Sequence, residues 1–226
     1  MSERLLADVR TVVFDVGETL VDETRHWGEW ADWLGIPRFT FFAAMGGAIA
    51  RGEPHRRAFE MVRPGIDLAA ALRQRVAEGW RYQFRPSDLY PDALPALRGL
   101  RELGIRIGIA GNQPAVAEAA LEEGGIAADF IAISGKLGVE KPDPRFFREV
   151  IRLSGEADPS RIACVGDRLD NDVIPAMEAG MRGIFIRRGP WATLQRAIDE
   201  TPVDLEIASL SELPALFGNG APEGSQ

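Results

Sequence analysis

Residues 10–20 of the chain read RTVVFDVGETL, a short apolar run that ends at Asp15 and is followed by a turn containing Gly17. β-Branched and aromatic residues favour strands, and a continuous apolar run of this length is typical of a strand buried on both faces. We therefore predict a buried strand over residues 10–15, with Asp15 at its carboxyl end.

Similar runs recur along the chain, and each of them is followed by small or polar residues. They cover residues 105–110, 162–165 and 184–186, with a weaker run over 130–133. Between them lie stretches with helical spacing of apolar residues, over 92–103, 114–123, 144–153 and 171–179. Strands that alternate with helices in this way are typical of parallel βαβ units. The sequence therefore predicts an α/β fold with a doubly wound parallel sheet.

The stretch between residues 22 and 88 breaks this alternation, because it contains no convincing strand pattern. Helical spacing and prolines predict about four helices there, over residues 26–35, 37–51, 54–63 and 67–85. We therefore expect an all-helical module, residues 22–88, inserted in a core made of residues 1–21 and 89–217. Residues 218–226 are rich in Gly, Pro and Ser, and we expect a disordered tail there.

Composition and charge exclude several classes of protein. The chain has 226 residues and a formal net charge of −8, which argues against nucleic acid and anionic membranes as partners. One cysteine, Cys164, is too few for a disulfide framework or a multi-cysteine zinc site, and two histidines, His26 and His55, are too few for a histidine-rich metal site. No apolar run approaches the roughly 18 residues of a membrane span. We therefore expect a cytoplasmic protein, monomeric or homodimeric, whose partner is a small molecule.

Polar residues of compatible chemistry stand where the predicted strands end. Asp15, Asn112 and Asp167 follow three strands, Asp172 begins a helix, and Lys141 lies in the loop before another helix. In an open parallel sheet, ligands bind beyond the carboxyl ends of the strands, so we expect these side chains at one crevice. Carboxylates gathered there suit a hard cation such as Mg²⁺, and Lys141 adds a positive charge for a phosphoryl group. A carboxylate that faces phosphorus can attack it and form an aspartyl phosphate, which water then cleaves.

Four sequence motifs link these residues to a known family. They are Phe14–Leu20 (FDVGETL), Gly111-Asn112, Glu140–Pro144 (EKPDP) and Val165–Asp172 (VGDRLDND). Together they resemble the four motifs of the haloacid dehalogenase-like hydrolase superfamily, over a region from Val12 to about Gly189. The resemblance implies a Rossmann-like core, a helical cap formed by residues 22–88, dependence on Mg²⁺ and, as in most members, phosphatase activity.

The resemblance also implies a role for each matching residue. The implied metal ligands are the side chains of Asp15, Asp167 and Asp172 and the backbone carbonyl of Gly17. The implied catalytic residues are Asp15 as nucleophile, Thr19 as a hydrogen-bonding brace for the loop, Asn112 in contact with the phosphoryl group, and Lys141 paired with Asp15 and the phosphate. Substrate binding would fall to Gly111, Asn112 and Lys141.

Two positions depart from the family pattern. Phosphatases of the family usually carry a second aspartate two residues after the nucleophile, which protonates the leaving group, and here that residue is Gly17. General acid–base help is worth about 10²–10⁴ in rate, so we expect slow turnover or an acid supplied from elsewhere. Glu18 and His26 are the candidate replacements. At Gly111 the family usually has Ser or Thr, so the phosphate loses one hydroxyl contact.

Two other functions stay open beside a Mg²⁺-dependent phosphatase acting on a small phosphorylated metabolite. Gly17 and Gly111 also fit a protein with this fold that binds a ligand or regulates, with little catalysis. A 2-haloacid dehalogenase would likewise use Asp15 as nucleophile, but its last motif is less acidic than this one. In the insertion, we interpret Trp27, Trp30 and Trp33 as hydrophobic packing.

Overall fold

The computed structural model describes residues 5–80 and 84–218. Within these ranges one six-stranded sheet has the order β3-β2-β1-β4-β5-β6, with every neighbouring pair parallel. Its strands are β1 (Thr11–Phe14), β2 (Arg106–Gly111), β3 (Phe130–Ile133), β4 (Ile162–Gly166), β5 (Arg182–Ile186) and β6 (Leu205–Ile207). The predicted doubly wound α/β sheet is confirmed, and β6 is an additional strand that the sequence pattern did not indicate.

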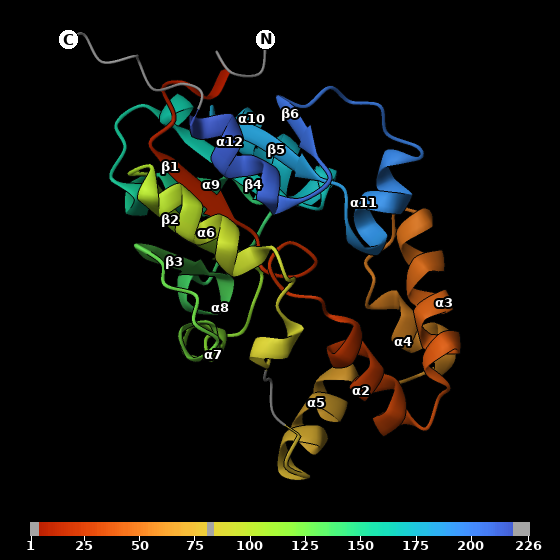
Figure 1. Cartoon of the computed structure of the whole chain (residues 1–226). Helices are drawn as coiled ribbons and strands as arrows, with labels where there is room; N and C mark the ends of the chain where they lie inside the picture. Colours follow the sequence, from red (N-terminus) through yellow and green to blue (C-terminus); the bar gives the residue numbers. More distant parts are fainter. Residues whose placement is uncertain (1–4, 81–83, 219–226) are drawn as a thin grey trace, which may run out of the picture.

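Helices cover both faces of this sheet (Figure 1). They are α6 (Ala93–Glu102), α7 (Ala117–Glu123), α8 (Ser134–Leu137), α9 (Pro144–Ser154), α10 (Ile174–Glu178), α11 (Gly189–Arg196) and α12 (Leu213–Gly218). Side chains of β1 alternate between the faces: Val12 and Phe14 join the cluster that contains Leu100 of α6, and Val13 joins the cluster of Phe146 on α9. Burial of each such side chain stabilises the fold by about 1.5–3 kcal/mol, which explains why Val12, Val13 and Phe14 are all apolar.

Four α-helices lie between β1 and α6 in the described residues, α2 (Thr24–Leu34), α3 (Arg38–Ala50), α4 (Arg57–Val62) and α5 (Leu68–Ala77). They share a hydrophobic cluster of their own, in which Trp30 packs edge-on against Phe59 and Phe59 against Phe41. Trp191 of α11 belongs to the same cluster, and α11 lies beside α3 in Figure 1. Trp27 and Trp30 are buried and Trp33 packs against the cluster, as the packing interpretation predicts.

Several helix boundaries differ from the prediction. The helix predicted over residues 67–85 ends at Ala77, because Gly79 adopts a left-handed conformation with φ of 90° that reverses the chain. Residues 81–83 of that prediction lie outside the described residues, as do residues 219–226 of the predicted tail. The helix predicted over residues 171–179 begins instead as a π-helical turn, Leu169–Val173, that runs into α10.

The two connections between the sheet and the inserted helices lie against each other. Val21 forms isolated bridges with Gly17 and with Leu89, and Asp22 N donates to Asp88 O over 2.8 Å. Arg25 Nη2 lies 2.5 Å from Asp88 Oδ2, which ties the first inserted helix to the returning chain. The boundaries predicted for the core and the insertion stay a prediction. In the described part of the chain, no helix combines the length and the apolar character that crossing a membrane requires.

Candidate active site

The order of the strands fixes where a ligand can bind. From β1 the chain adds β2 and β3 on one side, then crosses back to add β4, β5 and β6 on the other, so the order reverses between β1 and β4. Ligands of such sheets bind beyond the carboxyl ends of the strands at this point. Asp15, Asn112 and Asp167 follow directly after β1, β2 and β4.

Lys141 lies at the centre of the cluster that forms there. Its Nζ donates to Asp15 Oδ1 at 2.5 Å, to Asp172 Oδ1 at 2.6 Å and to the carbonyl oxygen of Ala110 at 3.0 Å. Burial alone would lower the pKa of Lys141, but the charges of Asp15 and Asp172 outweigh burial and raise it. Lys141 therefore carries a fixed positive charge with all three of its protons engaged.

Asn112 positions this lysine. Its Nδ2 donates to the carbonyl oxygen of Lys141 and its Oδ1 accepts from the Lys141 amide, each over 2.8 Å. The amide thus holds the backbone of Lys141 through two hydrogen bonds. The predicted contact between Asn112 and a phosphoryl group stays a prediction.

Three carboxylates, Asp15, Asp167 and Asp172, each offer an oxygen within 4.8 Å of the others. Burial and then the charge of Asp172 raise the pKa of Asp167 well above its ordinary range, and burial raises the pKa of Asp15 to about 6 against the opposing charge of Lys141. Oδ2 of Asp167 is buried and has no hydrogen-bond partner among the described residues. A buried carboxylate oxygen without a partner beside two more carboxylates suits a hard cation that binds through oxygen.

Exposure distinguishes the members of this cluster. The side chain of Asp15 is 12% exposed, whereas those of Lys141 and Asp172 are 1% and 0% exposed. Asp172 packs so closely on β4 that a Cβ on Gly166 would lie 2.4 Å from its Cβ, so only glycine fits there. Of the two carboxylates that bind Lys141, Asp15 is therefore the one that a solute can reach.

The hydrogen bond predicted for the side chain of Thr19 is not found among the described residues. Thr19 is fully buried, and its hydroxyl has no hydrogen-bond partner among the residues that the structure describes. The loop is held instead by main-chain hydrogen bonds from Leu20 and Val21 to the oxygen of Val16, and by Arg188, which donates to the carbonyl oxygen of Thr19 over 3.1 Å.

Glu18 serves the same loop. It has a left-handed backbone with φ of 54°, and its side chain is buried. Oε1 accepts from the amide of Glu23 at 2.9 Å, and Oε2 accepts from the hydroxyl of Tyr90 at 2.7 Å. Both oxygens are thus used to join the loop to the two connections of the insertion.

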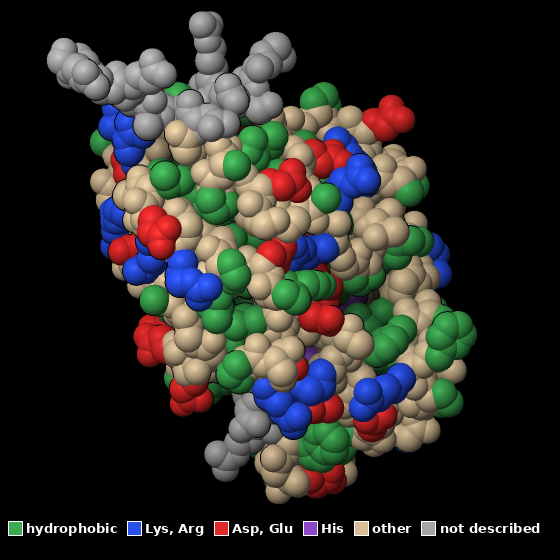
Figure 2. Space-filling view, in the orientation of Figure 1, with side chains coloured by type: hydrophobic (Ala, Val, Ile, Leu, Met, Phe, Trp, Pro, Cys, Tyr) green, Lys and Arg blue, Asp and Glu red, His purple; other side chains and the backbone are tan. Residues whose placement is uncertain are grey.

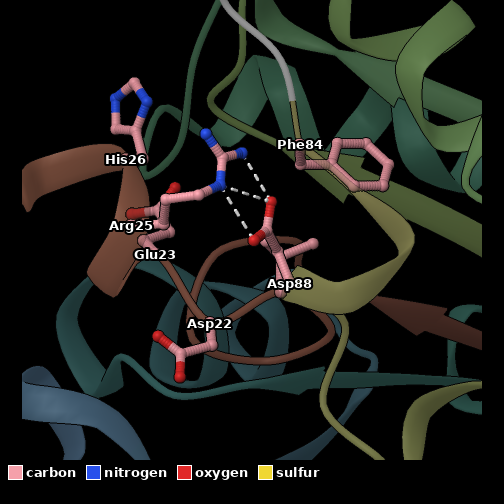
Figure 3. Close-up of a pocket in the computed structure, with 7 residues that line it drawn as sticks. Asp22, Glu23, Arg25, His26, Phe84 and Asp88 are labelled. Carbon is pink, nitrogen blue, oxygen red and sulfur yellow. Dashed lines mark hydrogen bonds and ion pairs between the residues drawn. The ribbon is translucent and has the colours of Figure 1, made fainter. Parts of the chain in front are cut away.

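His26 lies in a small pocket between those connections (Figure 3), together with Val21, Asp22, Glu23, Arg25, Phe84 and Asp88. Burial, and then the nearby charge of Arg75, lower the pKa of His26 to about 4. In the space-filling view, a hollow separates the sheet from the inserted helices, with histidine visible inside it and acidic side chains near its edge (Figure 2).

The two glycines that depart from the family pattern have close neighbours. A Cβ on Gly111 would lie 2.9 Å from Cγ2 of Val16, so Ser or Thr there would require Val16 to move. A Cβ on Gly17 would lie 2.8 Å from Cδ of Glu23, a residue that the motifs did not indicate. Burial, and then the charge of Glu18, raise the pKa of Glu23 to about 7. The missing side chain at residue 17 was the one sequence signal that another carboxylate could fill this space.

Comparison with known proteins places these residues in a family context. The sequence profile of the haloacid dehalogenase-like hydrolases matches residues 9–180. Glyceraldehyde 3-phosphate phosphatase of Methanopyrus kandleri is 39% identical over 168 residues, which are 72% of this chain and 72% of that protein. Phosphoserine phosphatase of Thermus thermophilus is 34% identical over 62% of this chain and 55% of its own length, so the match spans about half of that relative. Among solved structures, the HAD-hydrolase YfnB of Bacillus subtilis shares the fold, with a TM-score of 0.69 and 17% identity over 92% of this chain and 98% of that one.

Proposed function

Because the chain belongs to the haloacid dehalogenase-like hydrolase family, we propose that it is a phosphatase that acts on a small phosphorylated metabolite through an aspartyl phosphate on Asp15. One observation carries the proposal: the reachable carboxylate of Asp15 is held at 2.5 Å by the buried ammonium group of Lys141. This arrangement sets a nucleophile beside a fixed positive charge, and phosphoryl transfer needs both.

The proposed reaction has two steps. A carboxylate oxygen of Asp15 attacks phosphorus and forms a P–O bond, while the bond from phosphorus to the oxygen of the leaving alcohol breaks. Lys141 binds Oδ1 of Asp15, and we propose that Oδ2 makes this attack. Water then attacks the aspartyl phosphate and releases inorganic phosphate, which restores Asp15. In both steps, the ammonium group of Lys141 offsets negative charge. The side chain of Asn112 keeps Lys141 in place through hydrogen bonds to the Lys141 main chain.

We propose that Mg²⁺ is held by the side chains of Asp15, Asp167 and Asp172 and by the backbone carbonyl of Gly17. The donor set supports this, since the three side chains supply neighbouring carboxylate oxygens and Oδ2 of Asp167 is buried without a partner among the described residues. When bound, the ion would neutralise these charges and stabilise the negative charge on the phosphoryl oxygens.

The relatives suggest where to look for the substrate. Those proteins act on glyceraldehyde 3-phosphate and on phosphoserine, as their names state. Phosphorylated compounds of this small size are therefore the first to test. We further propose that helices α2 to α5 form a cap over the site and select among them, because their cluster reaches α11 next to the sheet.

The proposal is tested by incubating the protein with acetyl phosphate and p-nitrophenyl phosphate, with Mg²⁺ or with EDTA, beside the Asp15→Asn variant. We expect phosphate release that needs both Mg²⁺ and Asp15. Mg²⁺-dependent binding of phosphate compounds without turnover would instead favour the binding or regulatory function. Chloride release from 2-haloacids without Mg²⁺ would favour the dehalogenase.

A further inference from the structure

The proposed reaction requires a proton at two moments. As the bond to phosphorus breaks, the leaving alkoxide must take up a proton, and the water that attacks the aspartyl phosphate must later lose one. Gly17 has no side chain with which to do either. Lys141 has all three protons engaged, with Asp15, Asp172 and the Ala110 carbonyl.

Nearby titratable groups are already used elsewhere. Both oxygens of Glu18 accept hydrogen bonds that hold the loop, one of them from the hydroxyl of Tyr90. Cys164 is buried within β4, among the side chains that pack under α9. The ring of His26 packs edge-on against the ring of Trp27. Glu23 is the carboxyl group that remains beside Gly17.

The carboxyl group of Glu23 fills the space that a side chain at residue 17 would occupy. A Cβ on Gly17 would lie 2.8 Å from Cδ of Glu23, 2.9 Å from Oε1 and 3.1 Å from Oε2. Residue 17 is two positions from Asp15, on the loop that follows β1. A carboxyl group from the insertion thus stands where one from that loop is absent.

Contacts on several sides hold Glu23 in this position. Its amide donates to Oε1 of Glu18 at 2.9 Å, and Nε1 of Trp27 donates to its Oε2 at 3.0 Å. Gln113, which follows Asn112 after β2, also hydrogen-bonds to it. These contacts orient the carboxyl group from the insertion and from the sheet at once.

We propose that Glu23 is the general acid and base of this reaction, and this inference rests on the proposed phosphatase function. Glu23 gives its proton to the leaving oxygen as the P–O bond to the alcohol breaks. The resulting carboxylate then takes a proton from water while the water oxygen bonds to phosphorus and the bond to Asp15 breaks. Glu23 regains its proton, and the products are the alcohol and phosphate. The acid thus belongs to the residue that precedes the first helix of the insertion.

The test compares two substrates whose leaving groups differ in their need for a proton. The variant is Glu23→Gln, because Gln has the size of Glu and keeps an oxygen that can accept from Trp27. On an alkyl phosphate such as glycerol 3-phosphate, turnover should fall about 10²–10⁴-fold, because the alkoxide leaves only with a proton. On p-nitrophenyl phosphate, the first release of nitrophenolate should stay within about threefold of the wild type, while steady turnover falls for lack of a base. A burst of one nitrophenolate per site should therefore appear in stopped flow.

A second variant moves the carboxyl group. Glu23→Ala alone should lose activity on the alkyl phosphate, and Gly17→Asp combined with Glu23→Ala should recover at least about tenfold of it. The exchange is sterically possible, since the close contacts of a Cβ at residue 17 are with the Glu23 carboxyl group. A merely structural role for Glu23 predicts no recovery. Glu29→Gln, the same change within the helix that Glu23 precedes, should leave all rates near those of the wild type.

The possible results separate the two proposals. If the wild type needs Asp15 and Mg²⁺ but Glu23→Gln slows both substrates equally, or neither, Glu23 is not the acid and the phosphatase function stands. If the folded wild type hydrolyses no phosphate compound, the proposed function fails and the role of Glu23 fails with it.

Discussion

The sheet edge and the inserted helices bury their charged groups in different ways. At the sheet edge, the ammonium of Lys141 lies within 2.6 Å of two carboxylates and is almost fully excluded from solvent. Within the insertion, the guanidinium of the buried Arg75 lies instead 3.9 Å from the centre of the Trp30 ring, and its Nε has no hydrogen-bond partner among the described residues. The buried charge at the sheet edge is thus paired with opposite charges, whereas the buried charge of Arg75 packs against an aromatic ring. Changes in the two regions should therefore affect different properties.

The largest effect should follow the loss of the central charge at the sheet edge. Lys141→Met leaves two carboxylates without their partner, so we expect turnover to fall at least about 10³-fold and stability by about 3–5 kcal/mol. Steady-state kinetics and urea unfolding measure the two losses. Lys136→Met is the matched control, because Lys136 is exposed and pairs with Glu118 at the surface. Comparable losses in both variants would contradict a special role for Lys141.

A large stability effect without a direct chemical one should arise in the insertion. Phe59→Ala removes the ring that packs against Trp30 and Phe41, and we expect a loss of about 3–5 kcal/mol in unfolding free energy. Below the unfolding midpoint, turnover of acetyl phosphate should stay within about tenfold of the wild type, because no atom of the Asp15 cluster changes. Phe39→Ala, at an 86% exposed site on α3, should change neither quantity. Complete loss of turnover by folded Phe59→Ala protein would show that the two regions are not separable in this way.

Low pH should lower the stability of the packing between the inserted helices and α11, in which His55 takes part. His55 lies between the rings of Trp27 and Trp191, and burial, followed by the charges of Arg56, Arg168 and His26, lowers its pKa to about 3. The unfolded chain then binds a proton near pH 6.5 while the folded protein does not, so stability falls as the pH drops from 6.5 towards 3.

His55→Phe removes this proton linkage. Between pH 7 and pH 4, the variant should lose about 1–2 kcal/mol less stability than the wild type, a figure reduced for partial exposure. Urea unfolding at several pH values measures the difference. Above pH 7, the difference in unfolding free energy between His55→Phe and the wild type should be constant. If the unfolding free energies of the two proteins changed in parallel down to pH 4, His55 would titrate normally in the folded protein.

The smallest effect should come from the ion pair between the two connections of the insertion. Asp88→Asn removes the carboxylate that accepts from Arg25, and we expect a loss of about 1 kcal/mol because the pair is only partly buried. Asp32→Asn, which breaks a more exposed pair with Arg38, should cost less. If Asp88→Asn instead matched Phe59→Ala in thermal unfolding, polar contacts would stabilise the insertion more than packing does.

The elements of the fold differ in how far they could be predicted from the sequence. Asp15, Asn112 and Asp167 were predictable as site residues because they directly follow apolar runs, and parallel strands end at one edge. Strand β6 could not be predicted in this way, since it has three residues and only the last of them, Ile207, is buried. The helix that ends at Ala77 was overpredicted because Gly79 stops it without a break in composition.

The role given to Glu23 was beyond sequence reasoning for a different reason. Glu18 and His26 were the candidates, and the structure uses Glu18 to hold the loop and sets His26 in the pocket of Figure 3. Which carboxyl group faces Gly17 depends on the path of the chain between β1 and α2, and residue types do not determine that path. Thr19 shows the converse, because its motif predicted a hydrogen bond that its hydroxyl does not make with any described residue.

The most direct test of the account is to trap the phosphorylated protein. The protein would be mixed with Mg²⁺ and p-nitrophenyl phosphate, quenched in acid within its first turnover, and digested for mass spectrometry. We predict one added phosphoryl group on the peptide that contains Asp15, with more of it in Glu23→Gln and none in Asp15→Asn. Phosphate released at the wild-type rate with no phosphorylated peptide, or with the group on another residue, would contradict the account.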